Sequence, residues 1–198
     1  MYNFRVNSCN SWTNIILSST SPRRKELLGG LGIPFEVRFI PDIDESFPDN
    51  LPTDEIPCYI AQKKADAYRA SIKENELIIT ADTIVLLDNH VINKPVDRDD
   101  AIRMLRLLSG RAHEVITGVV MTTLDKQVVF SDHSMVDFAT LEDEEIIYYV
   151  DTFRPFDKAG AYGIQEWIGF IGVQGIRGSF YNVMGLPIQR LYQELKKF

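Results

Sequence analysis

The sequence has few of the residues that bind zinc or act in redox chemistry. Cys9 and Cys58 are its only cysteines, and neither has a second cysteine or a histidine at the spacing of a redox pair or a zinc site. We interpret both as free thiols, which are typical of a reducing compartment. The three histidines, His90, His113 and His133, are too dispersed to predict a zinc site or a Ser-His-Asp triad.

Basic charge and long apolar runs are scarce as well. The chain has 21 lysines and arginines against 28 aspartates and glutamates, so its net charge of -7 argues against a broad nucleic-acid interface, which needs a basic face. No stretch approaches the roughly 18 apolar residues of a membrane helix, and we expect no membrane partner. Residues 1–13 have one arginine and no apolar core. We expect them to be a loosely ordered extension rather than a signal peptide, and the protein to be cytoplasmic.

The apolar pattern predicts alternating strands and helices. With 198 residues and 45% hydrophobic content, the chain can bury one sizeable core, and we expect a single domain. The alternation indicates an α/β fold, and two long β-rich segments joined at Asp125-Lys126 indicate a hairpin and therefore a mixed sheet. We predict strands over 14–18, 34–40, 77–80, 84–87, 91–92, 115–124 and 128–139, and helices over 22–28, 53–72, 97–108, 142–150 and 187–197.

A hydroxyl-rich turn, Ser18-Ser-Thr-Ser-Pro-Arg-Arg24, links the first predicted strand to the first helix. Ser21 followed by Pro22 is typical of a helix N-cap and first helical position. Free N–H groups at this helix start, together with Arg23 and Arg24, would suit a phosphate. A serine-capped helix with two solvated arginines fits the pattern equally well, and the sequence contains no GxxxxGK[ST] P-loop.

Asp82 lies between two apolar segments, 77–80 and 84–87, which predicts a carboxylate at a strand end or bend. Burying a carboxylate costs free energy unless a cation or donor compensates, so a functional role is favoured over a turn-capping one. Glu36, in another apolar segment, is a second candidate carboxylate, although an outward residue of an edge strand is the stronger interpretation of its pattern. Three lysines accompany these segments, Lys64, Lys94 and Lys158, and any single lysine is most often a solvated surface charge.

Several longer motifs occur in one order along the chain. The main ones are Leu17-Ser-Ser-Thr-Ser-Pro-Arg-Arg-Lys-Glu-Leu-Leu28, Ala81-Asp-Thr-Ile-Val85, Asn93-Lys-Pro95 and Asp157-Lys-Ala-Gly-Ala-Tyr-Gly-Ile-Gln165. Shorter ones are Leu108-Ser-Gly110, His113-Glu-Val115, Thr117-Gly-Val119, Gly178-Ser179 and Gly185-Leu-Pro187. Together these motifs resemble the Maf-like nucleotide pyrophosphatase family, and the resemblance covers nearly everything from Asn14 onward.

The resemblance implies one α/β domain over residues 14–198, built as two lobes around a mixed, elongated sheet flanked by helices. This fold is similar to that of inosine triphosphate pyrophosphatase, with the nucleotide in a cleft between the lobes. The implied protein is a cytosolic enzyme, often a homodimer, that hydrolyses a nucleoside triphosphate to its monophosphate and pyrophosphate. Its implied cofactor is magnesium or manganese, with cobalt as an alternative.

The matching motifs also imply roles for individual residues. Ser19, Arg23 and Arg24 would grip the phosphates. Asp82 would be the catalytic carboxylate, and Asp82 and Glu36 would hold the metal ion. Whether Asp82 binds the metal, deprotonates water, or does both stays open.

Two lysines would neutralise the phosphates, Lys64 and Lys94. Gln62-Lys63 replaces the Arg-Glu that often precedes the matching lysine in the family, so the assignment of Lys64 could move to Lys63. Ser18 and Thr20 also depart from the family, where small residues such as Ala and Gly are common.

The segment 157–165 resembles the branch of the family that acts on dTTP and UTP. It implies that Thr83 and Gln165 lie beside the base and that Lys158 is a further substrate-binding residue. Two alternatives remain. One is a non-catalytic regulator of septum formation, the activity after which the family is named, and the other is the branch that prefers modified guanine nucleotides such as 7-methyl-GTP.

Overall fold

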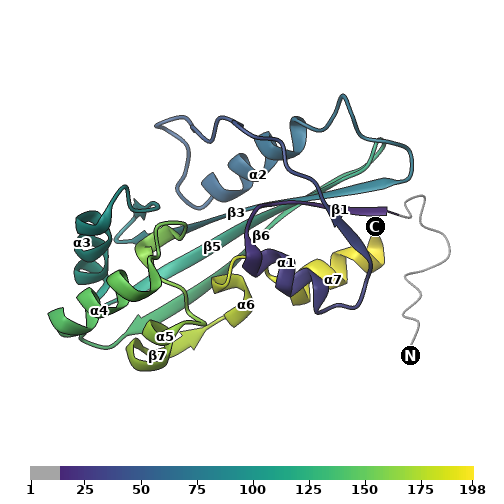
Figure 1. Ribbon diagram of the computed structural model, residues 1–198. Coiled ribbons are helices and arrows are strands. Elements are labelled where there is room, and N and C mark those ends of the chain that lie inside the picture. Colours follow the sequence, from purple (N-terminus) through teal and green to yellow (C-terminus); the bar gives the residue numbers. More distant parts are fainter. Residues whose placement is uncertain (1–13) are drawn as a thin grey trace. The chain divides into compact units, whose positions relative to one another are not determined.

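The structure, a computed structural model, describes residues 14–198. The expected N-terminal extension, residues 1–13, lies outside the described residues. The strands are β1 (Asn14–Ser18), β2 (Phe35–Val37), β3 (Glu76–Leu87), β4 (His90–Ile92), β5 (Ala112–Thr122), β6 (Gln127–Phe138) and β7 (Val173–Arg177). The helices are α1 (Pro22–Gly29), α2 (Ile56–Asp66), α3 (Arg98–Leu108), α4 (Asp143–Phe153), the 3-10 turn η1 (Ala159–Ala161), α5 (Trp167–Gly172), α6 (Phe180–Val183) and α7 (Ile188–Lys197) (Figure 1).

The strands form a seven-stranded sheet in the order β2-β1-β3-β5-β6-β7, and β4 pairs with β3. Strand β1 is parallel to both β2 and β3, whereas β4 is antiparallel to β3 and β7 is antiparallel to β6. The sheet is therefore mixed, and the predicted α/β class with a mixed sheet is confirmed.

Two compact units make up the described chain. Unit 1 contains the described residues up to Asp82 together with Thr117–Asp132 and Gly185–Phe198, and unit 2 contains Thr83–Ile116 and His133–Met184. Three of the four boundaries fall inside strands β3, β5 and β6, and the fourth, after Met184, falls between α6 and α7. That residues 14–198 form a single domain stays a prediction.

Unit 1 packs helices on both faces of its strands. Figure 1 shows α2 on one face of β1 and β3, and α1 and α7 on the opposite face. Because β1 is covered on both faces, Ile15, Ile16 and Leu17 are all buried and its apolar residues are continuous rather than alternating. On the face of α2, Ile16 packs with Ile78 and Tyr68.

Helix α2 approaches β5 closely in unit 1 because small residues line the contact. Ala61 and Ala65 pack against Val120. A Cβ atom at Gly118 would come within 2.4 Å of the backbone at Pro57 and Cys58. Only glycine fits at position 118 without moving the start of the helix.

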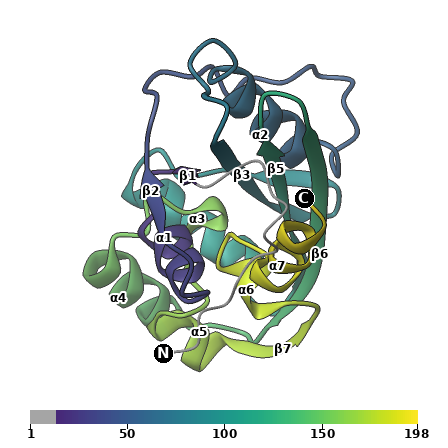
Figure 2. The ribbon, with the colours of Figure 1, turned by 90° about the vertical axis from the view of Figure 1, so that its right-hand side faces the viewer.

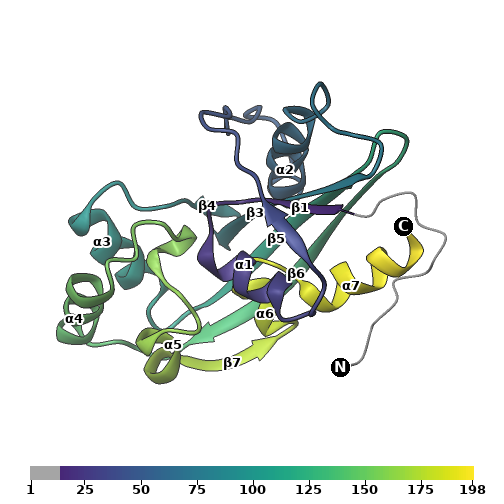
Figure 3. The ribbon, with the colours of Figure 1, turned by 45° about the vertical axis from the view of Figure 1, so that its right-hand side comes forward.

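Unit 2 places α3 and α4 side by side, as Figure 3 shows. Asp97 caps α3 by accepting a hydrogen bond from the backbone N–H of Asp100 at 2.8 Å, as the sequence predicts. Arg106 of α3 then binds Asp143 of α4 with two 2.8 Å hydrogen bonds. Farther along the chain, α5 leads directly into β7 (Figure 2).

Some predicted boundaries differ from the structure. Strand β3 is continuous, so the break predicted around Asp82 is wrong. The hydroxyl of Thr80 donates to the carbonyl of Ala61 at 2.7 Å and Asp82 is paired with Lys64, so α2 satisfies both polar side chains without interrupting the strand. Strand β2 and helix α2 are shorter than predicted, and the helix begins after Glu55 rather than at Thr53.

Candidate active site

Strand β3 and helix α2 bring Asp82 and Lys64 together in unit 1. Side chains alternate along a strand, so Thr80 and Asp82 share the face that α2 covers. Ala61 and Lys64 are three residues apart, about one helical turn, which matches this spacing. Lys64 Nζ lies 2.7 Å from Asp82 Oδ1, and both side chains are largely buried, with 14% and 12% exposed.

The same lysine binds a second carboxylate. Lys64 Nζ lies 2.9 Å from Glu45 Oε1, on the loop between β2 and α2. The sequence analysis missed Glu45 because four acidic residues between 41 and 52 were interpreted as a solvated loop. The signal that could have found it is the sequence Asp44-Glu45 followed by Lys63-Lys64, two adjacent acids and two adjacent bases.

The neighbouring lysine has a different role. Lys63 Nζ lies 2.8 Å from Asp44 Oδ2 and 2.9 Å from the carbonyl of Ser46. Hydrogen bonds from Lys63 and Ser46 hold the pKa of the Asp44 carboxyl well below its usual range. Lys64 is therefore the lysine that contacts Asp82, and Lys63 fixes the loop that carries Glu45.

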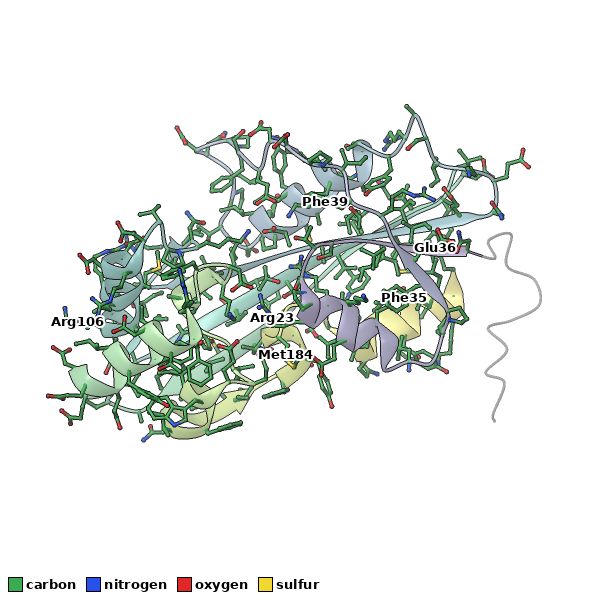
Figure 4. All side chains as sticks on the ribbon, in the orientation of Figure 1. Arg23, Phe35, Glu36, Phe39, Arg106 and Met184 are labelled. Carbon is green, nitrogen blue, oxygen red and sulfur yellow. The ribbon has the colours of Figure 1, made fainter. Side chains whose placement is uncertain are left out.

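The hydroxyl-rich turn forms the predicted helix cap. Ser21 caps α1 by accepting a hydrogen bond from the backbone N–H of Arg24 at 3.5 Å, and Pro22 opens the helix. The Ser19 hydroxyl accepts a hydrogen bond from the backbone N–H of Ser21 at 3.2 Å. Arg23 lies on the first turn of α1 (Figure 4). The turn is thus ordered by its own serines, and a phosphate-binding role for Ser19 and Arg23 stays a prediction.

Arg24 bonds to the backbone next to Asp82. Its Nε donates to the carbonyl of Gly185 at 2.7 Å and its Nη1 donates to the carbonyl of Ala81 at 2.9 Å. Burial lowers the pKa of the guanidinium, and the nearby charge of Asp82 opposes that shift. Arg24 thereby joins α1 to β3 at the residue before the catalytic candidate, a structural contact that the sequence pattern does not indicate.

Glu36 does not join the Lys64 cluster. In the sheet, Glu36 on β2 pairs with Ile16 on β1, and Ile16 pairs with Ile78 on β3. Asp82 is four residues beyond Ile78 and two strands from Glu36, which corresponds to roughly 16 Å between backbones. The Glu36 carboxylate is 62% exposed and lies 3.9 Å from Arg38. Figure 4 shows it on β2, well apart from Arg23.

Unit 2 contains the other predicted residues. Thr83 is half-buried in β3. Lys94 is exposed after β4 and lines a surface pocket of about 540 Å³ together with Arg103 and Arg111. The backbone N–H of Gly160 donates to the carbonyl of Asn93 at 3.1 Å, so the segment before Lys94 is tied to η1.

Lys158 and Gln165 lie in the segment that follows α4. Lys158 is 8% exposed, and its Nζ lies 2.8 Å from Asp157 Oδ1 and 3.2 Å from Glu166 Oε1. Oε1 of Gln165 is buried and has no hydrogen-bond partner within residues 14–198. The sequence analysis missed Glu166, which follows directly after the family motif.

Metal-binding groups are limited in the described part of the chain. Residues 14–198 contain no cluster of three or more His, Cys, Asp or Glu side chains suited to a metal ion. Asp82 and Glu45, which share Lys64, supply two carboxylates, and hard divalent ions favour such oxygen ligands. In the same residues, none of the helices has the length and apolar character that crossing a membrane requires.

Comparisons with known proteins agree with the motif resemblance. The model of the family described as Maf-like protein matches residues 14–198. A dTTP/UTP pyrophosphatase of Bacteroides thetaiotaomicron is 60% identical over 183 residues, covering 92% of this chain and 95% of that protein. One of Phocaeicola vulgatus is 62% identical with the same coverage.

A solved structure extends the likeness to the fold. The Staphylococcus aureus Ham1 protein superposes with a TM-score of 0.53 at 17% identity, covering 92% of this chain and 100% of that chain. This likeness concerns the fold alone and confirms the predicted inosine triphosphate pyrophosphatase-like class. From the family match over 14–198 and the high identity of these relatives, we conclude that the chain belongs to the Maf-like protein family.

Proposed function

We propose that the chain is a nucleoside triphosphate pyrophosphatase that hydrolyses dTTP and UTP to the monophosphate and pyrophosphate. The names of relatives at 60% and 62% identity support the substrate and the reaction. The structural observation that carries the proposal is the Lys64 cluster, in which one buried lysine joins Asp82 of the sheet to Glu45 of a loop.

Asp82 is the general base of this proposal. Lys64 binds its Oδ1, whereas its Oδ2 has no hydrogen-bond partner among the described residues. The Lys64 contact orients the carboxylate, and Oδ2 accepts the proton of the water that attacks the α-phosphorus. Pyrophosphate leaves from the opposite side in an in-line displacement.

Asp82 and Glu45 fit a divalent ion better than Asp82 and Glu36 do. Glu45 and Asp82 both contact the ammonium group of Lys64, so the two carboxylates lie close together. Glu36 instead pairs with Arg38 on the edge strand β2. Magnesium or manganese, with cobalt as an alternative, would neutralise developing phosphate charge when bound. Asp82 and Glu45 would hold the ion, and Lys64 keeps the repulsion between the two carboxylates small.

The phosphate contacts come from the α1 turn and from single lysines. Arg23, at the start of α1, presents a guanidinium whose fork matches phosphate oxygens, and the Ser19 turn supplies hydroxyl and N–H groups. In unit 2, exposed Lys94 adds positive charge.

Gln165 reads the base. Its buried Oε1 is an acceptor without a partner in the described chain, a state that costs about 1–3 kcal/mol unless a ligand donates to it. Uracil and thymine carry an N3–H donor beside the O4 acceptor, and a carboxamide complements both. Thr83 is the second residue that we assign to the base.

One panel tests the proposed function. Purified protein is incubated with dTTP, UTP, CTP, ATP, GTP and 7-methyl-GTP, each with magnesium, manganese or cobalt and with EDTA, and pyrophosphate is scored against orthophosphate. We expect pyrophosphate release, dependence on metal, and dTTP and UTP well ahead of ATP and GTP. Preference for 7-methyl-GTP would support the other family branch, and no turnover of any nucleotide would support the septum-regulator alternative.

We also propose a cytoplasmic homodimer without a nucleic-acid or membrane partner. The support is the resemblance to the family and the net charge of -7. Size-exclusion chromatography with light scattering tests the assembly, and a monomer at micromolar concentration would contradict it.

A further inference from the structure

Unit 2 contains a second buried polar network, centred on the hydroxyl of Tyr149 in α4. Tyr149 is fully buried, and its hydroxyl accepts a hydrogen bond from the backbone N–H of Gly163 at 3.0 Å. The same hydroxyl donates to Oε2 of Glu166. One side chain therefore holds both ends of a four-residue segment, and Gln165 is the third residue of that segment.

The segment is a closed turn. The backbone N–H of Glu166 donates to the carbonyl of Gly163 at 2.9 Å. A Cβ at Gly163 would lie 2.7 Å from Cδ of Glu166, so the carboxyl group lies directly over the glycine. A Cβ at Gly169 would lie 1.8 Å from the carbonyl oxygen of Ile164, so α5 also packs closely on the turn. These contacts leave the backbone of Gln165 little freedom to move.

The carboxylate of Glu166 stabilises this turn and does not cap the helix that follows it. Glu166 is the N-cap residue of α5, a position where short side chains such as Ser, Thr, Asp and Asn are preferred because they bond the helix N–H groups. Its side chain makes no such cap bond. It binds Tyr149 through Oε2 and lies 3.2 Å from Lys158 Nζ through Oε1.

Lys158 completes the network. Its ammonium lies between Glu166 and Asp157, so two carboxylates already neutralise it inside unit 2. Burial and the Glu166 carboxylate raise the pKa of the Tyr149 hydroxyl, which stays protonated and able to donate at any physiological pH. The hydroxyl of Tyr149 and the carboxylate of Glu166 are thus bonded within unit 2, whereas Oε1 of Gln165, in the same turn, has no hydrogen-bond partner in the described chain.

We propose that Tyr149 and Glu166 are positioning residues for Gln165 and set the selectivity of the enzyme for pyrimidine over purine triphosphates. The inference rests on the proposed function, in which Gln165 reads the base. The two residues act through the backbone of the 163–166 turn, which fixes where the carboxamide meets the N3–H and O4 edge. Loss of the hydroxyl or of the carboxylate frees the turn and weakens base recognition, while the chemistry at Asp82 is retained.

Tyr149→Phe is the main test, because it removes the hydroxyl and keeps the ring that stacks on Phe153 at 5.2 Å. We expect the KM for dTTP to rise about tenfold and kcat to change by less than about threefold, so that the ratio of kcat/KM for dTTP over GTP falls about tenfold. Glu166→Ala should reproduce this effect, and Glu166→Gln, which can still accept from Tyr149, should restore most of the selectivity.

Tyr148→Phe is the matched control. Tyr148 is the preceding residue of α4, half exposed, and its ring packs on Trp167 at 4.9 Å. Its loss of a hydroxyl should change neither KM nor selectivity. Thermal unfolding of every variant is recorded, and if Tyr149→Phe does not fold, Glu166→Ala and Glu166→Gln provide the same comparison.

A double variant separates positioning from a general structural role. If Tyr149 acts through Gln165, adding Tyr149→Phe to Gln165→Ala causes no further loss of selectivity. Additive losses, an unchanged dTTP to GTP ratio in Tyr149→Phe, or an equal fall of kcat for every base would overturn the proposal. Failure of the proposed function is distinguishable, because it would appear in the parent protein as turnover without pyrimidine preference.

Discussion

Each unit contains one buried lysine between two carboxylates, and the two clusters differ in what surrounds them. Lys64 in unit 1 lies 2.7 Å from Asp82 and 2.9 Å from Glu45, and Lys158 in unit 2 lies 2.8 Å from Asp157 and 3.2 Å from Glu166. The carboxylates of Lys64 come from a strand and a distant loop. Those of Lys158 come from residues one and eight positions away in the same segment.

The difference lies in the remaining hydrogen-bonding capacity. Glu166 is bonded by a buried tyrosine, so this carboxylate of the Lys158 cluster holds a turn, while Asp157 is 56% exposed. Asp82 has one oxygen without a hydrogen-bond partner in residues 14–198, and Glu45 is 48% exposed. Similar ion clusters can thus serve chemistry or structure, and available oxygens rather than charge distinguish them.

Asp82→Asn should have the largest effect, because it removes the open oxygen that makes the Lys64 cluster reactive. The amide is nearly isosteric but cannot act as a base, and we expect hydrolysis of dTTP to fall by about a thousandfold. Calorimetric titration with dTTP and metal should still detect binding, and circular dichroism should show a folded protein. Near-parental turnover would make Asp82 a structural residue.

The paired variants Lys64→Met and Lys158→Met test the comparison directly. Lys158→Met leaves Glu166 without its cation, and breaking a buried pair costs about 3–5 kcal/mol of unfolding free energy. Lys64→Met leaves Asp82 without its cation and should also destabilise the fold, but it should in addition lower kcat by about a hundredfold. Urea unfolding and steady-state kinetics on both variants provide the measurement. A hundredfold loss of kcat in Lys158→Met and not in Lys64→Met would mean that the roles of the clusters are exchanged.

His113 makes the stability of unit 2 dependent on pH. It is buried beside Tyr162, and burial lowers its pKa to about 4. The unfolded chain, with an ordinary pKa near 6.5, therefore binds more protons between those values, so stability is lost as pH falls from 6.5 towards 4. The expected loss is about 2 kcal/mol by pH 5. His113→Gln should show a smaller fall in Tm between pH 7 and pH 5, and an equal fall would contradict the assignment.

Arg23 and Arg24 should separate binding from stability within unit 1. Arg24→Ala removes two hydrogen bonds to backbone carbonyls and should cost about 2–3 kcal/mol of unfolding free energy. Arg23→Ala should lower kcat/KM by about tenfold, or 1.4 kcal/mol, with little change in Tm. The sequence pattern alone predicts the second behaviour for both arginines, and a stable Arg24→Ala would restore that interpretation.

The smallest effect is expected at Glu36. Glu36→Gln changes an exposed carboxylate on β2, so kcat/KM and the magnesium dependence should stay within about twofold. Glu45→Gln, its control in the Lys64 cluster, should raise the magnesium concentration needed for half-maximal activity by about tenfold. If both substitutions raised the required magnesium concentration equally, Glu36 would be a metal ligand as the motif resemblance implies.

Local patterns predicted the parts of the fold that local chemistry determines. The Ser21 and Asp97 caps, the β1 strand and the helices α1 and α3 follow from short motifs and apolar spacing. The glycine-rich segment 160–178 gave no strand or helix, although it contains α5 and β7. Its elements depend on contacts with α4 and β6, which a local pattern does not contain.

The residues of the candidate site that belong to sequence motifs could be predicted. Its contacts between residues far apart in the sequence could not. Asp82 and Lys64 were found from the motifs, but a loop residue such as Glu45 becomes a partner only after β3 and α2 are packed. The backbone contacts of Arg24 depend in the same way on residues 81 and 185. The apolar neighbours of Glu36 resemble those of Asp82 in the sequence, but the strand register places Glu36 two strands away from Asp82.

The close contact at Gly118 links residues that do not contact the substrate to the activity of the enzyme. An added methyl group there would push on the backbone at Pro57 and Cys58, where α2 begins, and the same helix carries Lys64. A 2.7 Å contact between Lys64 and Asp82 tolerates little displacement of that helix. Laboratory selection for altered turnover should therefore recover substitutions along the α2 and β5 contact as well as at the charged residues, and position 118 should accept them only together with compensating changes in α2.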